Sequence, residues 1–365
     1  MSRPGLVPRR CVVWFLGALL LAGLTLPASA DFIVSKSTSA DRLTLRNLVG
    51  EIQIEGHSGR DFEIEVSVQG RDADPDRIEV ELLEGSDATL NILFPLDESS
   101  SYVYPRIGRS TTKFSLERDG NMSWMSKLFG GSKKKITVSG KGSGLELWAD
   151  VTVRVPAGAT MRLEHGLGKV SATKIDGNLD LDSMSGSVEV TRLTGNLGID
   201  VGSGAVSVAH VEGHEILIDT GSGSVDLADC QAEEINIDTG SGHVEIADFR
   251  GEKLAVDTGS GHVEARGIDV ESAEIDTGSG GVQLELTGMG TGRFEIDTGS
   301  GGIDLYLPAD ASAEIRADTG SGGIHLDVDG ATVHHKDNDS ALIVVGGGAA
   351  DVKLDTGSGA IRIRS

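Results

Sequence analysis

Aspartate is the residue of this sequence that is best placed to do chemistry, because it recurs as the first residue of the pentapeptide Asp-Thr-Gly-Ser-Gly. Stacked copies would hold their carboxylates about 4.8 Å apart, and each neighbouring pair would repel by roughly 1 kcal/mol even in bulk water. Asx-turn hydrogen bonds from the backbone could offset this repulsion, and so could bridging cations such as Ca²⁺. The candidate Ca²⁺ ligands are Asp219, Asp238, Asp257, Asp276, Asp297 and Asp318.

The sequence Asp-Thr-Gly-Ser after an apolar residue also matches the active-site loops of aspartic proteases. In those enzymes two such carboxyl groups share one proton because they lie about 3 Å apart. That chemistry needs two loops that face each other across a cleft. Seven copies in one array lie side by side instead, so we exclude a protease.

A second set of candidate ligands lies just after two of the pentapeptides. His243 and His262 occupy equivalent positions in adjacent repeats, and Glu245 and Glu264 follow two residues later on the same face. Two imidazoles and two carboxylates within about 7 Å could hold a divalent transition metal. The alternative is an exposed ladder of polar side chains without a ligand.

These residues must be positioned by a repeated structural unit. Intact pentapeptides begin at the six aspartates above and at Asp355, and degenerate copies begin at Asp182 and Asp200. Successive starts from 182 to 318 lie 18 to 21 residues apart, and the last step is 37 residues. A fixed period near 20 indicates stacked units.

Each unit alternates apolar and polar residues on both sides of the bend, as in Ile235–Ile237 before it and Val244–Ile246 after it. Period-two alternation predicts two strands, each with one apolar face. The same phase in nine copies favours a coil that pairs in parallel with the next coil. We therefore predict an all-β, single-chain parallel β-solenoid whose aliphatic columns fill the lumen.

The composition fits this fold and restricts the function. The chain has 51 Gly in 365 residues, about twice the usual ~7%, and they gather at the bends. The formal net charge is −24, which disfavours nucleic acid and anionic lipid and favours cations or basic partners. Tyr306 is the only Tyr or Trp between 160 and 365, so an aromatic-lined carbohydrate groove is not expected.

Residues 1–30 have the features of a signal peptide. Arg9-Arg10 precede the apolar stretch Val12–Leu26, and Ala28-Ser29-Ala30 is an A-x-A cleavage site. We expect cleavage before Asp31 and an exported protein of the periplasm, the cell envelope or the exterior, without a later membrane span. Cys230 would then be the single cysteine; it aligns with Phe249 of the next repeat, which predicts a buried thiol.

The rest of the chain divides into three parts. Residues 31–95 alternate less regularly and are expected to form an N-terminal β cap, because the open end of a solenoid needs cover. Residues 96–135 form a polar and basic excursion, of which 122–135 could touch a membrane or a partner. Residues 136–365 hold the repeats, with an insertion near 330–348.

Two expectations concern the C-terminal end. The apolar Ala341–Val345 inside the insertion predicts a strand, and the 37-residue step would fit two coils of about 18 residues. The final strand, Ile361–Arg364, has outward arginines, which would suit an exposed last edge.

Three stretches together resemble the bacterial putative-adhesin domain family, a β-solenoid family of unknown function. They are Arg46–Val66, the Val-Pro-Ala-Gly at Val155–Gly158, and the repeated Ile-Asp-Thr-Gly-Ser-Gly-x-Val. The resemblance implies an exported envelope protein and supplies no catalytic residues.

We therefore expect a non-enzymatic, adhesin-like envelope or surface protein that binds a partner, surface or glycan through a long acidic face. The alternatives are a cation-stabilised structural or sensing module and, with less support, a carbohydrate-active β-helix enzyme. No cofactor other than Ca²⁺ is expected.

Overall fold

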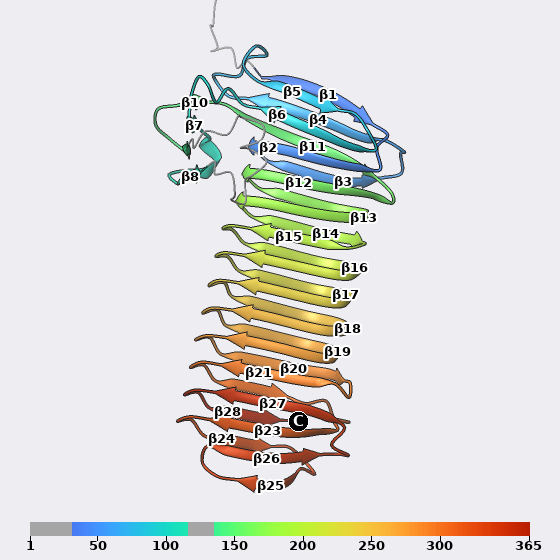
Figure 1. The fold of residues 1–365 in the computed structure, drawn as a ribbon, viewed down its shortest axis with the longest axis vertical. Helices are drawn as coiled ribbons and strands as arrows, with labels where there is room; N and C mark the ends of the chain where they lie inside the picture. Colours follow the sequence, from blue (N-terminus) through green and yellow to red (C-terminus); the bar gives the residue numbers. More distant parts are fainter. Residues whose placement is uncertain (1–30, 116–134) are drawn as a thin grey trace, which may run out of the picture.

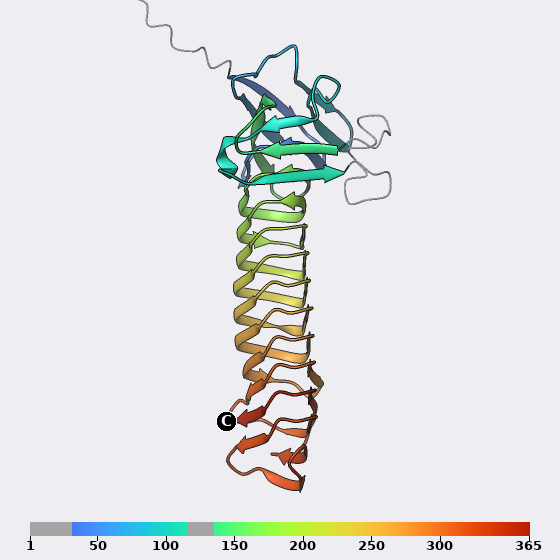
Figure 2. The same cartoon turned by 90° about the vertical axis from the view of Figure 1, so that its left-hand side faces the viewer.

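The computed structural model describes residues 31–115 and 135–365. In this part the chain winds into a long parallel β-solenoid, with the N-terminal strands at one end and the C-terminal strands toward the other (Figure 1, Figure 2). The predicted fold class is confirmed. The expected signal peptide and residues 122–134 of the expected contact segment lie outside the described residues.

The central coils repeat in strict register. Each long strand begins after one bend and runs to the threonine of the next, and Val206, Ile216 and Asp219 pair with Val225, Ile235 and Asp238. The later coils continue the same pairing. The strands of this kind are β16 (Val206–Thr220), β17 (Val225–Thr239), β18 (Val244–Thr258) and β19 (Val263–Thr277). The coils before them consist of β13 (Val170–Ser185), β14 (Val188–Thr194) and β15 (Leu197–Val201), and the coils after them of β20 (Val282–Met289), β21 (Arg293–Thr298) and β22 (Ile303–Tyr306), where the β19–β20 pairing contains register shifts.

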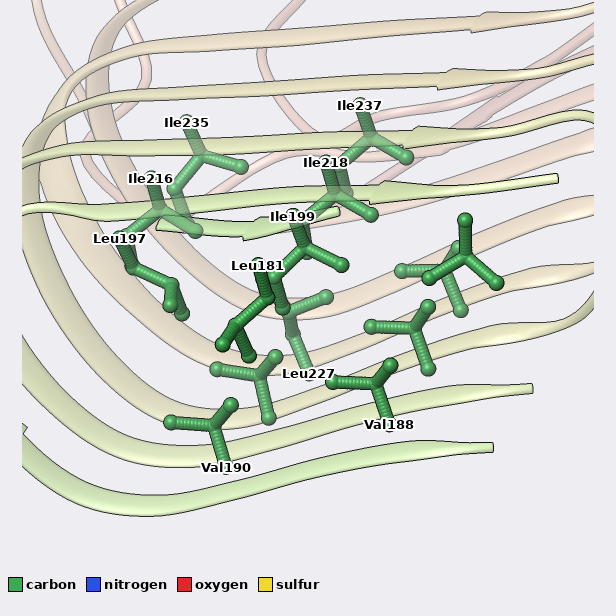
Figure 3. Close-up of a cluster of buried hydrophobic side chains, with 14 of the residues drawn as sticks. Leu181, Val188, Val190, Leu197, Ile199, Ile216, Ile218, Leu227, Ile235 and Ile237 are labelled. Atoms are coloured by element: carbon green, nitrogen blue, oxygen red, sulfur yellow. The ribbon is translucent and has the colours of Figure 1, made fainter. Parts of the chain in front are cut away.

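Aliphatic side chains fill the lumen between two columns of strands. Figure 3 shows the columns Leu197–Ile216–Ile235 and Ile199–Ile218–Ile237 on one side and Val188 and Val190 on the other. All of these side chains are at most 3% exposed. Burial of each such side chain stabilises the fold by about 1.5–3 kcal/mol, so the columns supply the main stabilising term.

A second corner of the coil was not predicted from the sequence. Non-glycine residues adopt left-handed backbone conformations there, with φ between 52° and 60°, at Lys174, Arg192, His210, Asp229 and Asp248. Glycine takes the same place in the next coil, at Gly267. An L-residue in this region costs roughly 1–2 kcal/mol, so the stacked neighbours must impose the turn.

The first coil of the solenoid lies inside the segment expected to be the cap. β2 (Arg42–Val49) and β3 (Ile52–His57) pair in parallel with β12 (Ala159–Leu167) and with β13. Beyond them, β6 (Asp87–Leu93) pairs with β2, and β11 (Trp148–Pro156) pairs with β3. The antiparallel strands β1 (Phe32–Thr38), β4 (Phe62–Gln69) and β5 (Glu79–Leu83) complete this end.

A small four-stranded sheet lies beside the N-terminal end (Figure 2). It consists of β7 (Ser101–Val103), β8 (Thr111–Ser115), β9 (Lys135–Ser139) and β10 (Leu145–Glu146), and the single-turn 3₁₀ helix η1 (Pro105–Ile107) follows β7. The predicted excursion was residues 96–135, and β7, η1 and β8 lie inside it, so part of that segment is regular structure.

The last coil of the chain lies between two coils that precede it in sequence (Figure 1). β27 (Ala350–Thr356) pairs in parallel with β21 on one side and with β23 (Ala313–Thr319) on the other. β28 (Ile361–Arg364) lies in the same way between β22 and β24 (Ile324–Asp327). The prediction that Ile361–Arg364 forms an exposed last edge was therefore wrong.

The insertion near 330–348 forms a hairpin. β25 (Thr332–Lys336) and β26 (Ser340–Val345) pair antiparallel, and β26 pairs antiparallel with β23. The strand expected at Ala341–Val345 is present, but the interpretation of the 37-residue step as two parallel coils was wrong. The hairpin instead covers the end of one column of strands and leaves the polar strand β25 at the edge, which discourages further pairing.

Candidate functional site

The bend aspartates form one unbroken row along the solenoid. Register pairing stacks ten carboxylates in spatial order, and Arg46 of the first coil stands directly before them. We call this row the carboxylate ladder. Its members are Glu164, Asp182, Asp200, Asp219, Asp238, Asp257, Asp276, Asp297, Asp355 and Asp318.

Glu164 and Arg46 close the N-terminal end of the ladder. Glu164 Oε2 lies 2.6 Å from Arg46 Nε, and Glu164 Oε1 lies 3.4 Å from Arg162 Nε. The Glu164 side chain is 10% exposed, so these two guanidinium groups neutralise a charge that would be costly alone. Asp182 follows as the first ladder carboxylate without a basic partner in hydrogen-bond range.

The environment of the ladder raises the pKa of several of its carboxyl groups. Burial, followed by the charges of Asp200 and Glu164, raises the pKa of Asp182 to about 7. Burial and then neighbouring ladder carboxylates also raise the pKa of Asp200, Asp238, Asp276 and Asp297. Burial is the largest cause in each case, and the like charge of the neighbouring carboxylate adds to it, so a cationic partner would favour the ionised form of these groups.

Threonine, rather than aspartate, supplies the hydrogen bonds of the bend. Thr258 Oγ1 accepts from the backbone N–H of Gly261 at 2.9 Å and donates to the carbonyl of Gly242 in the preceding coil at 3.4 Å. Thr239, Thr277, Thr319 and Thr356 accept in the same way from the glycine three residues later.

The Asx-turn expectation was therefore wrong. Within the described residues, none of the seven aspartates that begin an intact pentapeptide makes a side-chain hydrogen bond, because the buried threonine hydroxyl already holds the bend. The carboxylates remain available to solvent or to a partner.

Glycine is required in the bend because successive backbones approach closely. A Cβ on Gly242 or on Gly261 would lie 1.6 Å from the carbonyl oxygen of the glycine in the preceding coil. No side chain fits at that distance, so the close approach explains the repeated glycine and keeps the aspartates in register.

A shallow depression lies over one part of the ladder. It has a volume of about 370 Å³ and is lined by Asp200, Asp219 and Asp238 together with Gly198 and Leu217. Gly198 lacks a side chain, and Leu217 is 40% exposed. This depression was not predicted from the sequence. Gly198 could have indicated it, because the residues at the equivalent position of the neighbouring coils, Asp180 and Leu217, have larger side chains.

The two histidines lie next to each other as predicted from their positions. The rings of His243 and His262 stack with centroids 5.3 Å apart and planes 21° from parallel. Burial and then the charge of His243 lower the pKa of His262. Glu264 forms an ion pair with Arg266 of its own strand.

No group of three or more His, Cys, Asp or Glu residues among those described has a geometry that could hold a metal ion. The transition-metal site at His243, Glu245, His262 and Glu264 stays a prediction, as does the Ca²⁺ ladder.

Cys230 is a buried free thiol, as expected from its alignment. It pairs in register with Phe249, and its thiol donates to the carbonyl of Ala228 at 3.4 Å. Burial raises its pKa, so the thiol is protonated and unreactive at neutral pH.

The described chain is thus an all-β solenoid with a carboxylate ladder along it, and none of its helices is long and apolar enough to span a membrane. Residues 191–364 match the family model described as Toastrack DUF4097. This match supports the predicted resemblance to a domain family of unknown function. No curated protein matches the chain.

Several solved structures align with most of the chain at low similarity. A putative cell adhesion protein from Clostridium sporogenes is 11% identical, with 92% of this chain and 99% of that chain covered and a TM-score of 0.22. A putative adhesin from Bacteroides fragilis is 12% identical, with 91% and 96% covered and a TM-score of 0.34. A putative lipid binding protein from Parabacteroides distasonis is 12% identical, with 90% and 96% covered and a TM-score of 0.39. Likenesses this distant carry no argument about function.

Proposed function

We propose that this protein is a non-enzymatic, adhesin-like protein of the cell envelope or surface that binds a partner through the carboxylate ladder. The observation that carries the proposal is the unbroken stack of ten carboxylates in register. A partner with basic groups along an extended chain would neutralise several of these charges at once. Export, predicted from residues 1–30, would place the ladder where such partners are met.

The physical support is the mutual repulsion within the ladder. Burial is the largest cause of each raised pKa, and the charge of a neighbouring carboxylate adds to it. A bound cationic group reverses this effect, because an opposite charge within about 4–6 Å favours the ionised form. The depression at Asp200, Asp219 and Asp238 offers the easiest approach, since Gly198 removes a side chain from its floor.

The cation-stabilised module is the second candidate, and the same ladder supports it. Divalent cations such as Ca²⁺ would bridge neighbouring carboxylates in place of a basic partner. A thermal melt of residues 31–365 with Ca²⁺ and with chelator tests this candidate. An unchanged midpoint removes it and leaves the partner-binding proposal standing.

The partner-binding proposal is tested with an oligolysine peptide as the probe. The triple variant Asp200→Asn/Asp219→Asn/Asp238→Asn should bind the peptide at least tenfold more weakly than the unaltered chain, and the affinity of the unaltered chain should fall steeply with salt.

The matched control removes three exposed carboxylates from another part of the coils, in Glu215→Gln/Glu233→Gln/Glu252→Gln. Both triple variants change the net charge equally. Equal loss of affinity in the two would show that only total charge matters, and absence of oligolysine binding to the unaltered chain would refute the proposal. A polysaccharide pull-down with the same variants tests the glycan form of the hypothesis.

A further inference from the structure

Two coils that are consecutive in sequence are separated in space by the end of the chain. The coil of β21 and β22 and the coil of β23 and β24 do not pair with each other; β27 and β28 lie between them and pair with both. The last coil therefore occupies a slot with a strand edge on each side, unlike an ordinary terminal coil.

Ion pairs match the last coil to this slot. Lys353 Nζ lies 2.9 Å from Glu295 of β21, and Asp351 lies 2.7 Å from Arg316 of β23. Arg362 and Arg364 lie 3.4 and 3.5 Å from Asp304 of β22. Basic residues on the inserted strands thus face acidic residues on one wall of the slot, and an acidic residue faces a basic one on the other wall.

Buried contacts between the last coil and the strands on either side also fix the register in which the coil pairs. Val352, Leu354, Ile361 and Ile363 are fully buried. Thr356 Oγ1 donates to the carbonyl of Gly301 at 2.8 Å and is 3.0 Å from Thr298 Oγ1. A strand pair shifted by one residue would turn the apolar residues to solvent, so the slot selects the sequence pattern of this last coil.

The last coil is joined to the rest by a glycine hinge. Gly346 and Gly348 have φ of 58° and 67°, and the hinge crosses the start of β23, where Ser312 Oγ accepts from the N–H of Gly347 at 3.0 Å and of Ala349 at 3.2 Å.

We propose that this slot is a binding site for the last coil of a second copy of the chain, residues 350–364. A second copy presents the same charges, the same threonine and the same apolar pattern, so it fits the slot as well as the chain's own coil does. Exchange of an identical element through a hinge is a low-cost route to dimers, and each exchanged coil regains pairing on both sides.

The test uses two full chains in which Cys11 and Cys230 are replaced by alanine and one new cysteine is introduced in each, at positions that exchange brings together. One chain carries Glu314→Cys on β23 and the other carries Asp351→Cys on β27; these positions are register partners. Parallel neighbours lie about 4.8 Å apart, within the Cα separation that a disulfide bridges. The chains are mixed, warmed below the global unfolding transition, and cooled in a glutathione redox buffer.

We expect a covalent heterodimer whose yield rises with protein concentration and exceeds a control pair at least fivefold. The control pair is Glu245→Cys with Glu264→Cys, which are also register partners but lie in central coils that no terminal exchange reaches. A second test pair on the other wall, Glu295→Cys with Lys353→Cys, keeps the proposal falsifiable if one variant misfolds. Yields equal to the control at every concentration would overturn the proposal.

Discussion

The threonine of the bend offers the sharpest test of how the coils are held together. In Thr258→Val the side chain keeps its shape and loses the hydroxyl. The Thr258 side chain is fully buried, so the substitution leaves the N–H of Gly261 and the carbonyl of Gly242 without their partner. A buried donor left without a partner costs about 1–3 kcal/mol, and we expect a destabilisation of about 2 kcal/mol.

The structure supplies a matched control in the same column. Thr220 is equally buried, but its Oγ1 has no hydrogen-bond partner, and valine already stands at the equivalent place in the preceding coil, at Val201. Thr220→Val therefore removes a hydroxyl that is desolvated without compensation. We expect its stability to stay the same or to rise by up to about 1 kcal/mol.

Urea unfolding followed by far-UV circular dichroism measures the global effect, and hydrogen exchange at the amide of Gly261 measures the local one. In a stack of repeats, local opening need not equal global unfolding, so the exchange measurement decides. Equal destabilisation by Thr258→Val and Thr220→Val would refute the assignment of the bend to threonine hydrogen bonds.

Three further perturbations test other parts of the fold. Burial and like charge raise the pKa of Asp182 to about 7, so its unfolded form ionises first and stability should fall as pH rises from about 4 to 7; Asp182→Asn should flatten this decline in urea titrations across pH. Asp248→Gly should raise the thermal midpoint by removing left-handed strain at φ 56°, with a net gain of about 0.5–1 kcal/mol, and an unchanged or lower midpoint would contradict it. Arg46→Met should destabilise by about 3 kcal/mol near pH 7, because it removes the closest partner of the buried Glu164. Urea unfolding measures this loss, and a loss below about 1 kcal/mol would show that the ion pair contributes little to stability.

The repeating half of the fold could be predicted from the sequence. Val206–Val208 and Ile216–Ile218 keep one phase in every coil, and a strand with one apolar face can bury it only when each coil repeats the register of the last. The carboxylate ladder followed from the same constraint, because a residue fixed relative to the bend must stack on its equivalents. In this part of the chain the local sequence pattern and the tertiary fold agree, so the pattern alone was sufficient to predict the strands and their register.

Tertiary structure alone decided the ends and the chemistry of the bend. Asp and Thr are both able to bond the backbone of a turn, and only the direction of each side chain, outward at Asp257 and inward at Thr258, assigned that task to threonine. The spatial order of the last coils could not be predicted from the sequence either. Asp318 and Asp355 begin the same pentapeptide, so the coil of either one could pair in register with the coil of Asp297. Repetition makes such partners locally equivalent, and the choice among them depends on how the hinge, the hairpin and the ion pairs fit in three dimensions.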